Sequence, residues 1–367
     1  MKLLIKATGL LLLLAAIGLV SLFLVVSYDS ACEDVSTSPI NAETMRAIVY
    51  HCYGSPDVLA YEDIEKPMPA DNEVLVKVHA ASVNPLDWHY MRGSPSLMRL
   101  MSGLGKPNST RLGVDFAGTV EAVGKSVKKF KPGDQVFGGK NGAFADYLVI
   151  AEDRALAHIP PNITLEQAAT VPIAAISALQ ALRDKGHLKA GQSVLINGAS
   201  GGVGTFAVQI ARSFGAEVTG VCSARNAEMV RSIGANHVID YTRENFTESK
   251  KRYDLIIDNV GNHSLLKYRD ALKPGGTLVM LGGSSDGFIT PLVNPLKALF
   301  LSPFVSQNFA MFMAQMNAED LATLAELMQS GDITPVIDRR YPLQEVADAI
   351  RYSEEGHARG KILVTMD

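Results

Sequence analysis

The sequence predicts an α/β protein with two folded domains, a doubly wound parallel sheet and a smaller, partly closed β-barrel, preceded by one N-terminal transmembrane helix. Three observations predict this. The 367 residues exceed the length at which a single hydrophobic core usually stops growing. Strand and helix patterns alternate after residue 193, whereas short strands dominate residues 45–149. A long apolar run lies within the first 28 residues.

The N-terminal segment has the length and composition of a membrane span. No residue between Lys6 and Asp29 is charged, and about 20 helical residues suffice to cross a bilayer core of roughly 30 Å. A signal peptide is the main alternative, but the apolar run is longer than the usual ~7–15 residues, and Asp29 disfavours cleavage near Cys32. We therefore expect a single-pass membrane protein with an uncleaved anchor over residues 1–28 and a tether over residues 29–44.

Charge and cysteine content exclude several classes of protein. The net charge of −4 gives no reason to expect a nucleic-acid partner, and the 47% hydrophobic content excludes a disordered chain. The three cysteines, Cys32, Cys52 and Cys222, lack metal-ligand spacing, and an odd number cannot pair completely. We expect no metal site and no disulfide framework, with Cys52 and Cys222 as small buried residues in strands.

Residues 45–149 carry the pattern of a β-rich domain. Strands are expected at residues 46–50, 74–80, 118–123 and 142–149, where apolar residues lie between clusters of turn residues. Because no helix-period stretch separates these strands, we expect them to form a small partial barrel.

The stretch from Ser193 to Ala216, SVLINGASGGVGTFAVQIARSFGA, organises the second domain. An apolar strand runs into a glycine-rich turn, after which apolar residues recur at helical spacing. Such a turn is tight, lets the backbone approach a pyrophosphate without a Cβ in the way, and points unpaired helix amides at negative charge. We therefore predict a dinucleotide site with contacts from Ser200, Gly201, Gly202 and Val203.

The alternation of strands and helices continues beyond this turn. Strands are expected at residues 217–222, 237–240, 254–259 and 277–281, with helices at 226–233 and 263–272. Repeated βαβ order predicts a parallel, doubly wound sheet. Ligands bind such sheets at the carboxyl ends of the strands, which brings Asn259 and Gly282 to the expected site.

The end of the second strand of this domain indicates which coenzyme binds. The stretch from Val221 to Arg225 lacks the acid that would hold a free ribose 2′-hydroxyl, whereas Ser223 and Arg225 can donate to a 2′-phosphate. A hydrogen bond to a charged group contributes roughly 1.5–3 kcal/mol, which is about a tenfold to hundredfold preference. The sequence therefore predicts NADPH rather than NADH.

Several motifs resemble those of one enzyme family. YGSPDVL, ASVNPLDWHYMRG, LGVDFAGTVEAVG, KPGDQVFG, GAFADYLV and ARGKILV are similar to segments of the medium-chain dehydrogenase/reductase superfamily, in particular its zinc-independent quinone oxidoreductase (zeta-crystallin-like) branch. The resemblance covers nearly everything after residue 44. It implies a GroES-like catalytic domain over residues 45–165, a Rossmann NADP-binding domain over 166–311 and a catalytic return segment over 312–367.

The resemblance also implies roles for individual residues. Asn84 would reach the nicotinamide or a substrate oxygen, with turn capping before Pro85 as the alternative. Relatives carry a Tyr where His89 aligns without gaps, and Tyr90 follows it, so which of the two points into the cleft stays open. Three further cofactor contacts are expected: Ser177 on the interdomain helix, Tyr241 at the adenosine pocket and Lys361 facing the interdomain cleft.

The motifs depart from those of zinc-dependent relatives, which resemble this chain but place a Cys, a His-Glu pair and a second Cys around the reacting carbon. Here Asn84, Pro85 and Asp87 occupy the first stretch, and LGVDFAG stands where a Gly-His-Glu run would be. Without a Lewis acid, alcohol oxidation is disfavoured. Reduction of an electron-poor quinone or enone needs only hydride placement, a donor to the oxyanion and a proton source.

Together these features predict a membrane-anchored, zinc-independent, NADPH-dependent reductase of quinones or α,β-unsaturated carbonyls. The alternatives are a zinc-free dehydrogenase of another carbonyl class and a non-catalytic NADPH-binding scaffold or sensor at the membrane. The apolar segment 288–313 leaves open a homodimer contact, a pocket wall or a bilayer contact. The charges flanking the N-terminal run favour export of the enzyme, but its need for a pool of reduced coenzyme opposes export, so the side of the membrane stays open.

Overall fold

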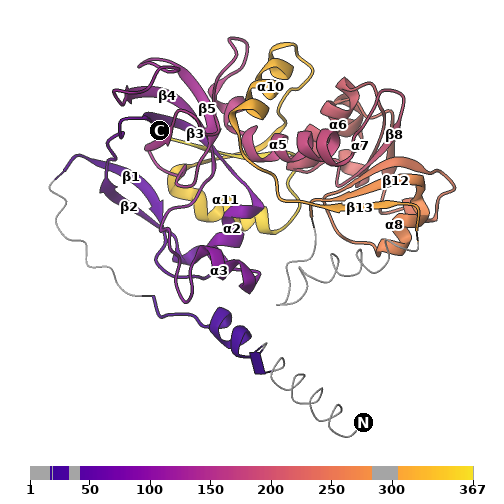
Figure 1. Ribbon diagram of the computed structural model, residues 1–367, viewed down its shortest axis with the longest axis horizontal. Helices are drawn as coiled ribbons and strands as arrows, with labels where there is room; N and C mark the ends of the chain where they lie inside the picture. The colour runs from indigo at the N-terminus through magenta and orange to yellow at the C-terminus, as the bar shows by residue number, and fades with distance from the viewer. Residues whose placement is uncertain (1–16, 19, 33–41, 283–304, 367) are drawn as a thin grey trace, which may run out of the picture.

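The computed structural model describes residues 17–18, 20–32, 42–282 and 305–366. Figure 1 shows the strands of the first part of the chain gathered at one side of the molecule and a second sheet at the other, with α5 (Pro172–Gln180) and α10 (Ala318–Gln329) between them. The chain therefore has the expected α/β architecture with two sheets.

The first sheet contains seven strands and includes the end of the chain. Its order is β14-β15-β3-β4-β5-β7, with β6 also pairing with β3. The last strand, β15, lies antiparallel to β3 and parallel to β14, so residues 361–365 are built into the sheet that β3 belongs to. A separate antiparallel hairpin joins β1 to β2. The bounds are β1 Thr44–Val49, β2 Ala60–Glu65, β3 Glu73–Val83, β4 Asp115–Val123, β5 Gln135–Gly139, β6 Tyr147–Ala151, β7 Leu156–His158, β14 Ile337–Pro342 and β15 Lys361–Thr365.

Helix α2 (Pro85–Arg92) follows β3 after a single residue, Asn84. It starts at Pro85. Proline suits this position because an N–H in the first turn of a helix has no partner within the helix. The Asp87 carboxylate accepts a hydrogen bond from the backbone amide of Asn84 at 2.7 Å. It ends at Gly93, whose φ of 56° is the left-handed conformation that glycine adopts readily. The other helical segments packed around this sheet are η1 Pro56–Val58, η2 Ser96–Met98, α3 Arg99–Ser102, α4 Leu165–Ala169, η7 Leu343–Glu345 and α11 Val346–Glu354.

The second sheet is parallel throughout, in the order β10-β9-β8-β11-β12-β13. This arrangement confirms the predicted doubly wound sheet, and its strand order reverses between β8 and β11. One hydrophobic core joins Ile196 of β8, Phe206 of α6 and Phe137 of β5, so the two sheets share a core across α5. The bounds are β8 Ser193–Asn197, β9 Glu217–Cys222, β10 His237–Asp240, β11 Tyr253–Asp258, β12 Leu272–Met280, β13 Asn308–Met311, α6 Gly202–Ser213, η4 Ala224–Asn226, α7 Ala227–Ser232, η5 Phe246–Glu248 and α8 Leu265–Ala271.

The helical stretch expected over residues 165–182 is interrupted. It forms α4 and α5, followed by η3 (Ala181–Lys185). Pro172 occupies the first turn of α5 because it has no N–H to donate into a preceding helical turn.

The expectation of a single-pass membrane anchor is wrong. Residues 1–16 and 19 lie outside the described part of the chain, and residues 17–18 and 20–27 are helical. No helix among the described residues is long and apolar enough to cross a membrane. The end of the expected span packs instead on the first domain, because Val26 is buried and the Arg99 guanidinium donates to the carbonyls of Val26 and Tyr28 at 3.1 and 3.3 Å.

The expected tether over residues 29–44 is attached to the first domain where the structure describes its start. The Ser30 amide donates to the Gly105 carbonyl at 2.9 Å, and the Arg99 guanidinium lies 2.8 Å from the Asp29 carboxylate. These contacts are tertiary, so the local composition that predicted a tether gives no sign of them. Residues 33–41 lie outside the described part of the chain.

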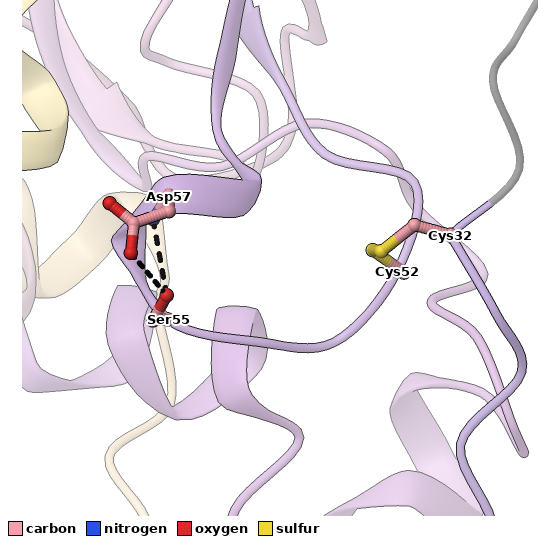
Figure 2. Close-up of a disulfide and its surroundings, with 4 residues drawn as sticks. All are labelled: Cys32, Cys52, Ser55 and Asp57. Carbon is pink, nitrogen blue, oxygen red and sulfur yellow. Dashed lines mark hydrogen bonds between the residues drawn. A yellow bond between two sulfur atoms is a disulfide. The ribbon is translucent and has the colours of Figure 1, made fainter.

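Cys32 and Cys52 form a disulfide, so the expectation of unpaired cysteines is wrong for these two residues. Their Cα atoms are 5.2 Å apart, and Figure 2 shows the bond attaching the N-terminal segment to the chain just before the turn at Ser55 and Asp57. The two cysteines meet because residues 26–30 dock on the first domain, which sequence spacing does not reveal. Cys222 is buried with a free thiol at the end of β9, as expected.

Candidate active site

A cavity of about 550 Å³ lies where the carboxyl ends of β8, β9 and β11 face the end of β3 and the start of β15. The glycine turn and the first turns of α2 and α5 complete its wall. Most of the expected site residues line this cavity, namely Asn84, Ser200, Gly201, Gly202, Val203, Ser223, Arg225, Tyr241, Asn259 and Lys361.

The glycine turn brings open backbone to the cavity. A Cβ on Gly204 would lie 2.1 Å from the Gly198 carbonyl oxygen, so the turn can be this tight only with glycine at that position. At Gly201, by contrast, the nearest atom to such a Cβ is 3.5 Å away, so no other atom crowds the backbone there. The 12-residue helix α6 starts directly afterwards, and the unpaired amides of a helix N-terminus attract a phosphate.

One end of the cavity carries hydrogen-bond donors and no acid at the end of β9. Arg225 is exposed, and its guanidinium donates to the His357 carbonyl at 3.4 Å. Asn226 is only 5% exposed, and its Nδ2 donates to the Ser200 hydroxyl at 3.0 Å. Asn226 Oδ1 has no hydrogen-bond partner among the described residues. Sequence reasoning missed Asn226 and His357, because an Asn beside a predicted helix start is ordinarily a cap.

The other end of the cavity holds a buried polar network centred on Asp115. One carboxylate oxygen accepts from the Ser82 hydroxyl at 3.0 Å, from Asn84 Nδ2 at 3.0 Å and from Lys361 Nζ at 3.4 Å. The other accepts from the Ile173 amide at 2.9 Å, at the start of α5. Lys361 also donates to Asn84 Oδ1. The Asn84 side chain makes no capping bond to α2 and faces this network instead.

Burial shifts the ionisation of two groups beside the network. It raises the pKa of Asp87 to about 7, although the amides of Asn84 and Gly113 donate to this carboxylate and oppose the shift. Burial also lowers the pKa of Lys361, against the attraction of Asp115 and Asp87. This end of the cavity is therefore a place where charge is costly unless it is paired.

Four expected site residues are not among the described residues that line the cavity. His89 lies with Nδ1 2.6 Å from the Ser94 carbonyl and its ring centroid 3.8 Å from that of Trp88. Tyr90 packs against the barrel core. Ser177 follows Ile173, which does line the cavity, by about one turn of α5. Gly282 lies against Asn259, since a Cβ there would be 2.1 Å from the Asn259 carbonyl oxygen.

The fold and the cavity define a two-domain nucleotide-binding protein of the dehydrogenase class. A family model described as alcohol dehydrogenase GroES-like domain matches residues 70–161, and one described as zinc-binding dehydrogenase matches residues 233–364. The chain belongs to the medium-chain dehydrogenase/reductase superfamily, in its quinone oxidoreductase branch. Within the described residues, no group of three or more His, Cys, Asp or Glu side chains is placed to hold a metal ion.

Three known proteins illustrate the similarity. The chain is 37% identical to the mitochondrial NAD(P)H oxidoreductase RTN4IP1 of Mus musculus, over 90% of this chain and 92% of that one. It is 33% identical to 2-methylene-furan-3-one reductase of Solanum lycopersicum, over 92% and 83% of the two chains. The structure of Escherichia coli quinone oxidoreductase complexed with NADPH matches with a TM-score of 0.74 and 28% identity, over 87% and 99%.

Proposed function

We propose that this protein is an NADPH-dependent oxidoreductase that reduces quinones or α,β-unsaturated carbonyls without a catalytic zinc ion. The observation that carries the proposal is the single cavity that joins the glycine turn and Arg225 at one end to the buried Asn84 network at the other. Two relatives are named as a quinone oxidoreductase and a 2-methylene-furan-3-one reductase, and the compounds in both names are conjugated carbonyls, which supports this substrate class.

The residues around the cavity fit NADPH. Gly201 leaves room for a pyrophosphate, and Ser223 and Arg225 can donate to a 2′-phosphate. Asn226 and Asn259 each have a buried Oδ1 with no partner among the described residues, and buried acceptors of this kind are ordinarily satisfied. When bound, NADPH supplies the hydride. The chain's own residues bind the coenzyme, orient it and exclude water from the reacting carbon.

The hydrogen bonds of the network support zinc independence. Asp115 stands in the stretch where zinc-dependent relatives carry a Gly-His-Glu run, and its carboxylate accepts from four donors inside the protein. Asp87 accepts from two backbone amides. Both carboxylates are therefore engaged as structural acceptors, and in the described part of the chain neither belongs to a group of three or more side chains that could hold a metal ion.

A homodimer is the assembly that we propose for this enzyme. β13 ends the described order of the second sheet, so one of its edges is unpaired among the described residues. Met311 and Met313 beside this edge are 47% and 80% exposed. Edge strands of this kind readily pair with another chain. Light scattering after gel filtration should give twice the chain mass, and a monomer at micromolar concentration would contradict the dimer.

The function is tested by following NADPH absorbance against a panel of quinones, enones, saturated ketones and alcohols. We expect turnover of the quinones and enones but not of the saturated ketones or alcohols. Metal chelators should not change these rates. Turnover of saturated ketones instead would favour a dehydrogenase of another carbonyl class, and tight NADPH binding without turnover would favour a scaffold. Arg225→Ala should weaken NADPH binding about tenfold and spare NADH, and equal losses for both coenzymes would remove the role assigned to Arg225.

A further inference from the structure

The Asn84 carboxamide is almost fully committed to protein partners. Asn84 is 2% exposed and lines the cavity. Its Nδ2 donates to the Ser82 carbonyl at 3.2 Å and to Asp115 Oδ2 at 3.0 Å, which uses both hydrogens of the amide nitrogen. Its Oδ1 accepts from Lys361 Nζ, and a carbonyl oxygen can accept once more. Counted over the contacts of the described residues, the Asn84 side chain therefore has hydrogen-bonding capacity left only as an acceptor.

The ion pair between Lys361 and Asp115, together with the Ser82 carbonyl, decides which way this amide points. An ammonium group can only donate and a carboxylate can only accept. Rotating the Asn84 amide by half a turn would set Nδ2 against Lys361 and Oδ1 against the Asp115 carboxylate, so both contacts would become repulsive. Lys361 is 3% exposed and Asp115 is fully buried, so water cannot relieve that repulsion.

The same pair connects Asn84 to the coenzyme-binding half of the molecule. Asp115 accepts from the Ile173 amide of α5, and Gly360 bridges to Gly201 of the glycine turn. A Cβ on Gly202 would lie 3.2 Å from Cδ of Lys361, so the lysine stem passes close beside the turn. The groups that orient Asn84 are thereby fixed relative to the pyrophosphate site.

We propose that Lys361 and Asp115 are positioning residues that make Asn84 an acceptor for the carboxamide N–H of the coenzyme's nicotinamide, and not a donor to the substrate oxygen. This inference rests on the proposed function, and it deepens it by choosing between the two roles that Asn84 could have. Asn84 lies at the end of the cavity away from Arg225. If the pyrophosphate binds at the glycine turn and the 2′-phosphate at Arg225, the nicotinamide lies at the Asn84 end. The oxyanion of the substrate then takes its hydrogen bond from another group.

A coenzyme analogue tests the assigned role. Reduced 3-acetylpyridine adenine dinucleotide phosphate carries a methyl ketone in place of the carboxamide, so it lacks the N–H that Asn84 would accept. We expect the wild-type protein to bind NADPH roughly two- to tenfold more tightly than the analogue in a fluorescence titration, the range that one hydrogen bond contributes. Asn84→Ala should abolish this preference. The double variant Lys361→Met with Asp115→Asn should reduce it, because only the Ser82 carbonyl then favours this orientation of the amide.

The double variant also separates positioning from stability. Either single substitution leaves a buried charge unpaired and should lower Tm, whereas the double substitution should restore much of Tm without restoring the coenzyme preference. The control removes another ion pair, Arg183 and Asp320 at 2.7 Å, which does not line this cavity. Arg183→Met with Asp320→Asn should keep the preference.

Three outcomes would contradict the inference. Equal affinity of the wild-type protein for NADPH and the analogue would overturn it while leaving the proposed function standing. A preference that survives undiminished in the double variant would overturn the role of the two charges. Failure of the wild-type protein to bind either compound would overturn the proposed function itself.

Discussion

Asn226 Nδ2 donates a hydrogen bond to the Ser200 hydroxyl at 3.0 Å, which joins the loop after β9 to the glycine turn. Because the Ser200 oxygen accepts from Asn226, its own hydrogen is free to turn toward the cavity that both residues line. Asn226 Oδ1 stays buried without a partner among the described residues. A carbonyl oxygen can only accept a hydrogen bond, and an ionised phosphate has no hydrogen to donate. The group of the coenzyme that suits Asn226 Oδ1 is therefore a ribose hydroxyl or the adenine amino group.

Asn226→Leu should therefore weaken NADPH and NADH binding by the same factor, about five- to tenfold, because the ribose and the adenine are common to both coenzymes. Fluorescence titration of both coenzymes measures this. Arg225→Ala is the matched control, since only NADPH should be affected there. A loss confined to NADPH in the Asn226 variant would show that Asn226 serves the 2′-phosphate instead.

The buried Asp87 carboxyl should make stability fall as pH rises. Its folded-state pKa of about 7 lies above the ordinary value of 3.8, so the folded protein holds this proton more tightly than the unfolded chain does. The contribution to stability is complete below pH 3.8 and is lost as pH rises through about 7. Relative to Asp87→Asn, the wild-type protein should lose about 3 kcal/mol of unfolding free energy between pH 5 and pH 8. Urea unfolding across that range measures the difference, and parallel curves for the two proteins would refute the shift.

Reduction of the Cys32–Cys52 disulfide should destabilise the protein. The bond closes a loop between residues 20 apart in sequence, which corresponds to about 3 kcal/mol if it acts through the entropy of the unfolded chain. Dithiothreitol should lower Tm of the wild-type protein and leave Tm of Cys32→Ser unchanged. Peptide mapping without reductant checks the bond directly, and labelling of both cysteines as free thiols would exclude it.

The nucleotide-binding half of the fold follows from local patterns in the sequence. The strand, glycine turn and helix around residues 193–216 each have a short-range signal, and the structure places β8 and α6 there. Ser223 and Arg225 come to the cavity because residues at the carboxyl ends of parallel strands share one edge of the sheet. Ser177, which the family resemblance implied, lies about one helical turn from Ile173, which does line the cavity.

The features that sequence analysis missed depend on contacts between distant residues. Asp115 and Lys361 are 246 positions apart, and neither motif that contains them shows that one charge faces the other. The docking of residues 26–30 likewise depends on Arg99, whose burial beneath the N-terminal segment has no local signature. The apolar composition that suggested a membrane span is no guide to this docking, because Val20, Leu24 and Val25 are exposed and, among the described residues of this run, only Val26 is buried.

The position of β15 between β14 and β3 has a consequence for how the protein is made. β3 emerges from the ribosome early, but one of its neighbours in the sheet is β15, which consists of residues 361–365. The pairing of β3 with β15 therefore has to wait until residue 365 has been synthesised, although N-terminal domains ordinarily fold first. All six strands of the parallel sheet lie between residues 193 and 311, so the segment that forms this sheet is complete before β15 has been made.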